Sequence, residues 1–81
     1  MSPEFRSKLE KEKKAEIIRL KEMLSNAKLS LADSSSILRS GKLTPWERTE
    51  WKRVHKRRIN SVRSMVRHLL GEQMKLKMLF L

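Results

Sequence analysis

The chain contains no cysteine and no tyrosine, and among its 81 residues there are only two glycines, two prolines and two tryptophans. Without cysteine there is no disulfide framework, no thiolate nucleophile and no cysteine-based zinc site. Few turn-forming residues argue against a β-sheet architecture, which needs a turn after each short strand. The aromatic fraction of 5% and the hydrophobic fraction of 38% leave little material for a compact core. These absences favour long, solvated helices.

Long hydrophobic runs are also lacking. No stretch approaches the roughly 18 consecutive apolar residues of a membrane span. Charged residues follow the first methionine almost at once, which is not typical of a secretory signal. We therefore expect an intracellular protein. Residues 1–5, with the letters MSPEF, are typical of a cloning linker, and we expect residues 6–81 to form one domain.

Catalytic and cofactor-binding signals are missing as well. The sequence has no glycine-rich phosphate loop, and its two histidines, His55 and His68, fall on different faces of a helix. One helix therefore cannot present both imidazoles to the same metal ion. The carboxylates of the first half are spread along a charged surface rather than paired for acid–base chemistry. We expect no enzymatic activity, no cofactor and no metal site.

The segment that organises the chain is Thr44-Pro45-Trp46-Glu47. Thr44 and Glu47 have the spacing of a capping box, in which each side chain accepts a hydrogen bond from the backbone N–H of the other residue. Pro45 falls at the first helical position, where its missing N–H costs nothing. Gly41, just upstream, is a suitable end for a preceding helix. Two independent signals therefore start a helix at Pro45.

Apolar and charged residues on both sides of this start predict an all-α protein. The first helix is expected at about 3–38, the turn at 39–43 and the second helix at about 45–78. Because the connection is short, the helices should be antiparallel neighbours in a hairpin that resembles a coiled coil. We expect the second helix to continue through Gly71, at a cost of about 1 kcal/mol, because apolar residues recur as far as Phe80.

Each expected helix carries one apolar stripe. Apolar residues of the first helix alternate at spacings of three and four, and those of the second gather on one side of the helix. The residues predicted to pack between the helices are Ile17, Leu20, Leu24, Leu31, Trp51, Ile59, Val62, Val66 and Leu69. Two such stripes shelter each other poorly, and a core of this size supplies only about 3–5 kcal/mol. We therefore expect a homodimeric four-helix bundle or docking on helices of another protein.

Positive charge concentrates in the second half. The formal net charge is +11, and residues 34–81 contribute +9, with twelve Lys or Arg against three Asp or Glu. Residues 51–71 contain seven basic residues and no acidic one. The predicted basic surface consists of Lys52, Arg53, Lys56, Arg57, Arg63 and Arg67. Such a surface can follow phosphates or face an acidic protein. The run 52–58 also fits a nuclear-localisation pattern, which favours a nuclear location.

Two residues depart from the pattern and are candidate anchors for a partner. Trp46 points away from the apolar stripe, so it either anchors a partner or folds over the connection against Leu43. Arg58 falls inside the stripe. It either extends out of the stripe along its stem or meets an acceptor from another chain and fixes the register.

The sequence predicts a non-catalytic helical module for protein–protein interaction or oligomerisation, whose basic second helix lies near nucleic acid or an acidic partner. The alternative is a domain that binds DNA or RNA directly, mainly through the phosphate backbone. Calmodulin or an anionic membrane could also bind a basic amphipathic helix. Both are disfavoured, because they need an apolar stripe that the first helix is expected to cover.

Overall fold

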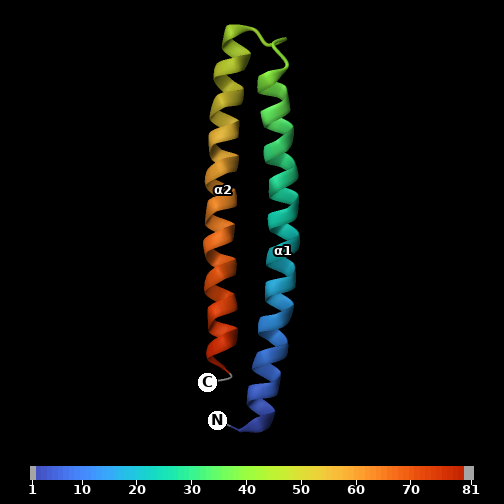
Figure 1. Ribbon diagram of the computed structural model, residues 1–81, viewed down its shortest axis with the longest axis vertical. Coiled ribbons are helices and arrows are strands. Elements are labelled where there is room, and N and C mark those ends of the chain that lie inside the picture. The colour runs from blue at the N-terminus through green and yellow to red at the C-terminus, as the bar shows by residue number, and fades with distance from the viewer. Residues whose placement is uncertain (1, 80–81) are drawn as a thin grey trace.

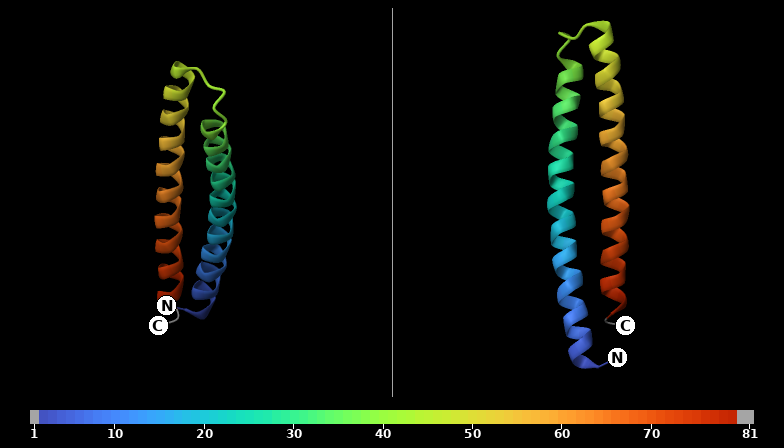
Figure 2. Two further views of the ribbon diagram at one scale, coloured as in Figure 1. Left: turned by 45° about the horizontal axis from the view of Figure 1, so that its top comes forward. Right: turned by 180° about the vertical axis from the view of Figure 1, so that it is seen from behind.

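The computed structural model is a hairpin of two long antiparallel helices, α1 (Pro3–Arg39) and α2 (Pro45–Met78) (Figure 1). The structure describes residues 2–79, so Met1 of the expected linker and Phe80 in the expected apolar continuation lie outside the described residues. The start of α1 and the end of α2 lie at the same end of the molecule, opposite the connection (Figure 2). The prediction of an all-α hairpin is confirmed.

Helix α1 is continuous over 37 residues. At its start, the Ser2 side chain accepts a hydrogen bond from the backbone N–H of Phe5, at 3.2 Å. Pro3 occupies the first turn, where it needs no hydrogen-bond acceptor. After the helix ends, Gly41 has a φ of 70°, in the left-handed region that a residue without Cβ enters without steric cost. This residue lets the chain turn back towards α2.

Helix α2 begins with the predicted capping box. The Thr44 hydroxyl accepts from the backbone N–H of Glu47, and the Glu47 carboxylate accepts from the backbone N–H of Thr44, both at 3.2 Å. The hydrogen bonds with Thr44 lower the pKa of the Glu47 carboxyl. Beyond this start, α2 runs through Gly71 without a break. Packing against α1 therefore outweighs the modest helix penalty of one glycine.

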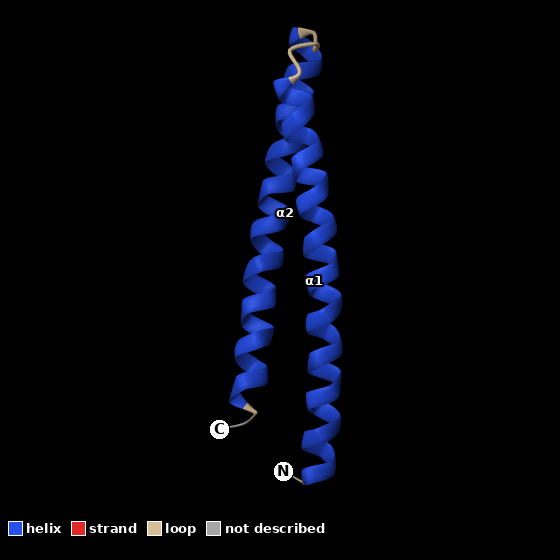
Figure 3. Ribbon diagram, turned by 45° about the vertical axis from the view of Figure 1, so that its right-hand side comes forward, coloured by secondary structure: helices blue, strands red, loops and turns tan. Residues whose placement is uncertain are grey.

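The hairpin is a rod rather than a globule. Its Cα atoms extend over 62 × 14 × 13 Å, with a radius of gyration of 18.4 Å, whereas a compact chain of this length has about 12 Å. In Figure 3 the helices overlap near the connection and separate towards the other end, so the pair is twisted about its long axis. Neither helix, among the described residues, has the length and hydropathy required to cross a membrane.

Candidate functional site

The apolar residues between the helices are only partly shielded from solvent. Ile17, Leu20 and Leu24 of α1 are buried, and no other apolar side chain among residues 2–79 is. Leu31 is half-buried. The predicted packing residues of α2 are also half-buried, namely Trp51, Ile59, Val62, Val66 and Leu69. The hairpin therefore brings the predicted stripes together but leaves the α2 stripe partly exposed to solvent.

The row of α2 that lies between the helices is more polar than the sequence suggested. Half-buried or buried residues recur at spacings of three and four, namely Arg48, Trp51, His55, Arg58, Val62, Met65, Leu69, Glu72 and Leu76. Four of these nine side chains are polar or charged, and each bonds to α1. Polar contacts, as well as apolar packing, therefore connect the helices along most of their length.

Besides the hydrogen bond from the Arg48 guanidinium to the Leu38 carbonyl, at 3.4 Å, there are three such contacts, and the first joins Ser34 to His55. Their Oγ and Nδ1 atoms are 2.7 Å apart, and Ser34 is completely buried. The same hydroxyl donates to the Leu31 carbonyl at 3.0 Å, which leaves its lone pair to accept from a His55 imidazole protonated at Nδ1. This contact was not predicted from the sequence, in which His55 was considered only as a possible metal ligand. The sequence feature that points to this contact is Ser34, a small polar residue within the apolar stripe of α1, which lies opposite His55.

Arg58 makes the second contact. Its guanidinium donates to the backbone carbonyl of Ser30 at 2.7 Å and lies 5.7 Å from the centre of the Trp51 ring. The acceptor that Arg58 meets therefore belongs to its own hairpin, and the cation–π contact adds to the packing near the connection. Trp46, in contrast, is 72% exposed, so it does not fold over the connection.

The third contact is an ion pair at the opposite end of the hairpin. Lys13 Nζ lies 2.7 Å from Glu72 Oε2, and Lys75 Nζ lies 3.2 Å from Glu72 Oε1. Glu72 is buried. The hydrogen bond from Lys13 lowers the pKa of the Glu72 carboxyl, and the same bond raises the pKa of Lys13. Lys13 lies four residues before Ile17, where a charged residue interrupts the apolar stripe of α1. Its ion-pair partner is Glu72, the one acidic residue in the sequence after Glu50.

Glu72 also belongs to a cluster with Glu16 and His68. Each of the three residues has an atom of the kind that binds metal ions, a carboxylate oxygen or an imidazole nitrogen, and these atoms lie within 4.8 Å of one another. Glu16 Oε1 is 3.9 Å from His68 Nε2. The Lys13 ammonium lies beside both carboxylates, 3.8 Å from Glu16 Oε2. The cluster's negative charge is therefore already balanced by this ammonium and by Lys75. The cluster was not predicted from the sequence, in which His68 was compared only with His55 as a possible metal ligand.

The predicted basic surface is exposed at all six positions, Lys52, Arg53, Lys56, Arg57, Arg63 and Arg67. Arg53 pairs with Glu50 at 3.3 Å. None of the other five has an ion-pair partner within residues 2–79. Unpaired guanidinium and ammonium groups on a rigid helix produce a field that attracts anionic partners.

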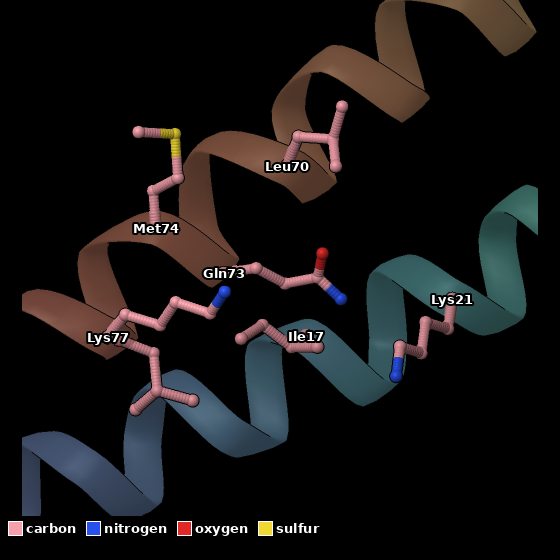
Figure 4. Close-up of a pocket in the computed structure, with 7 residues that line it drawn as sticks. Ile17, Lys21, Leu70, Gln73, Met74 and Lys77 are labelled. Atoms are coloured by element: carbon pink, nitrogen blue, oxygen red, sulfur yellow. The ribbon is translucent and has the colours of Figure 1, made fainter.

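The two flanks of the hairpin differ in charge. On one flank an open groove with a volume of about 480 Å³ lies between the helices (Figure 4), and we call it the cationic groove. It is lined by Ile17, Lys21, Leu70, Gln73, Met74, Leu76 and Lys77. A second depression, which we call the mixed-charge flank, is lined by Glu16, Arg19, Leu20, Met23, Ser64, Met65 and His68. Only the mixed-charge flank has acidic and basic residues in its lining.

No protein-family model matches the chain, and no curated protein or solved structure is significantly similar to it.

Proposed function

We propose that the chain is a non-catalytic helical interaction module whose hairpin associates with a second copy to form a four-helix bundle. The observation that carries this proposal is the excess surface. The chain exposes 6572 Å², whereas a compact monomer of 9.6 kDa exposes about 5,100 Å². The excess of about 1,500 Å² exceeds the roughly 800 Å² that each partner buries in a standard interface. Apolar side chains on one flank of the hairpin supply surface for that contact, namely Leu20, Met23 and Met65.

The mixed-charge flank is the better surface for a second copy. A two-fold dimer brings the same patch of both chains together, so a patch with both signs of charge can pair with itself. Glu16 and Arg19 provide the two signs here, and Met23, 44% exposed, provides apolar surface beside the buried Leu20. The cationic groove would instead bring lysine against lysine.

A dimer of this kind makes the melting temperature depend on protein concentration. We expect the midpoint of thermal unfolding to rise by several degrees when the concentration is raised from the low to the high micromolar range. Met23→Glu should weaken association at least about tenfold, equivalent to about 1.4 kcal/mol, because it replaces an apolar side chain of the contact by a charged carboxylate that would lose its hydration on association. Circular dichroism melts at a series of concentrations measure both effects.

The matched control is Leu29→Glu, the same kind of change at an α1 side chain that is 69% exposed and outside the mixed-charge flank. It should melt with the wild-type dependence on concentration. A wild-type midpoint that is the same at every concentration would overturn the proposed dimer.

The second candidate function is direct binding of nucleic acid, with a nuclear location. It is supported by the exposed basic residues of α2 and by the absence of acidic residues over 51–71. We expect labelled duplex and single-stranded oligonucleotides to bind with an affinity that falls steeply as salt rises. Reversing Lys52, Lys56, Arg63 and Arg67 to Glu should abolish binding but leave the dimer intact. Binding seen only at low salt would reject this candidate.

A further inference from the structure

We propose that the cationic groove binds an amphipathic helix of a second protein, whose apolar stripe is bordered by Asp and Glu residues. This inference rests on the proposed role as an interaction module. It uses the flank opposite the one assigned to the second copy, so the two proposals can fail separately.

The groove exposes large apolar side chains to solvent. Ile17 lies at its base. Leu70 and Met74, which occupy successive turns of α2, are 54% and 66% exposed. In Figure 4 the Gln73 side chain extends between the helices towards Ile17, whereas Met74 projects away from α1. Met78, one turn further on, is also exposed. A row of large apolar side chains at helical spacing is what an amphipathic partner helix recognises.

Both borders of the groove are cationic. Lys21 on α1 and Lys77 on α2 line it directly. Lys28 lies one heptad after Lys21, and Arg67 one heptad before Met74, so both should project on the same side of the molecule. None of these four side chains has an ion-pair partner within the described part of the chain. On α1, towards its start from Ile17, Lys14 is already paired with Glu10 at 2.8 Å.

The combination of exposed apolar side chains and cationic borders selects the kind of partner. A second copy would place lysines against lysines, which costs free energy. Nucleic acid would use the cations but leave Leu70 and Met74 uncovered. A helix with acidic residues beside an apolar stripe satisfies both features. The α2 residues that line the groove run from Leu70 to Lys77, which corresponds to about 12 Å of helix, so a partner helix of about two to three turns would cover it.

The test uses three labelled synthetic helices of equal length with the same leucine stripe, bordered by Glu, by Gln or by Lys. Fluorescence anisotropy with the full chain at near-physiological salt should show micromolar binding of the Glu peptide. The Gln and Lys peptides should bind at least about tenfold more weakly, a difference of about 1.4 kcal/mol. Equal affinity for all three peptides would overturn the proposal.

Two sets of substitutions assign the binding to the groove. Leu70→Ser with Met74→Ser should weaken binding of the Glu peptide at least about tenfold, and circular dichroism should show unchanged helicity because both side chains are exposed. Lys21→Glu with Lys77→Glu should reverse the preference, so that the Lys peptide binds better than the Glu peptide. This reversal cannot result from unfolding. If the variant loses affinity for the Glu peptide and gains none for the Lys peptide, the proposed ion pairing is wrong.

The matched controls lie away from the groove. Lys42→Glu with Arg57→Glu changes the net charge by the same amount, at exposed positions in the connection and on α2, and should leave both peptide affinities close to wild type. Met23→Glu should weaken the dimer without affecting the Glu peptide. Vesicles containing phosphatidylserine are the competing probe. If they bind more tightly than the Glu peptide, and Leu70→Ser with Met74→Ser abolishes that binding, the groove is a membrane contact and the proposal is rejected.

Discussion

Leu24→Ala is expected to unfold most of the hairpin at room temperature. Leu24 is one of three buried apolar side chains among the described residues, and removing a leucine side chain from a packed core costs about 2–5 kcal/mol. A core of this size contributes only about 3–5 kcal/mol in total, so a single truncation removes most of the margin. Circular dichroism should show a large loss of helicity at concentrations where the wild type is folded.

The matched control is Leu29→Ala. It removes the same atoms from the same helix, but Leu29 is 69% exposed, and surface substitutions of this kind change stability by less than about 0.5 kcal/mol. The two variants should therefore melt far apart. If they melt at the same temperature, Leu24 does not lie in the core and the helices pack by a different face.

Glu72→Gln is expected to give the second-largest loss of stability. The substitution replaces the carboxylate by a neutral amide with one acceptor oxygen, so the ion pairs with Lys13 and Lys75 are both lost and only one of the two hydrogen bonds can be kept. Breaking a partly buried ion pair by changing one member is costly, because the remaining charge is left without compensation. At neutral pH the melting temperature should fall by several degrees.

The effect of Glu72→Gln should depend on pH. The pKa of Glu72 is lowered from 4.5 by the Lys13 hydrogen bond, so the folded state holds this proton less tightly than the unfolded state. The contribution of the Glu72 carboxylate to the stability of the folded state is complete above pH 4.5 and is lost as the pH falls through the lowered pKa. Lys13 has a pKa raised above 10.5, so its contribution is complete below pH 10.5 and is lost as the pH rises through the raised pKa. Melting temperatures from acid to neutral pH should show wild type and variant converging in acid.

Glu22→Gln is the control for this titration, because Glu22 is exposed and has no ion-pair partner within residues 2–79. It should stay within about 0.5 kcal/mol of wild type across the whole range. A constant difference between wild type and Glu72→Gln, persisting below the pKa of the carboxyl, would show that the ion pair is not the cause.

The ends of the helices could be predicted because their signals are local. Thr44, Pro45 and Glu47 act on backbone groups within one turn, and Gly41 has the backbone conformation that ends a helix. The apolar stripe of α1 was equally accessible, since its alternating spacing places Ile17, Leu20 and Leu24 on one face. Such features need no knowledge of the other helix.

The polar contacts between the helices could not be predicted in the same way, because they depend on the register. Lys13 looked like a break in one stripe, and Glu72 was a single acid in a basic region. They form a pair only when the turn at Gly41 sets which residues lie opposite each other. The same holds for Ser34 and His55, which are 21 positions apart in the chain and 2.7 Å apart in space.

The difference between the flanks also appears only in three dimensions. Lys21 and Lys77 are distant in the sequence, but they border one groove. Leu70 and Met74 belong to no site predicted from the sequence, because helical periodicity places them to one side of the main stripe. The antiparallel arrangement brings one flank of each helix to the same side of the molecule and so creates a surface that neither helix has by itself.

The central claim is that the hairpin is one half of a larger helical assembly. Sedimentation equilibrium of the full chain at near-physiological salt tests it most directly. We expect a species of twice the chain mass of 9.6 kDa at micromolar concentrations, which dissociates and loses helicity on dilution. A fully helical monomer of 9.6 kDa at every concentration would contradict the claim.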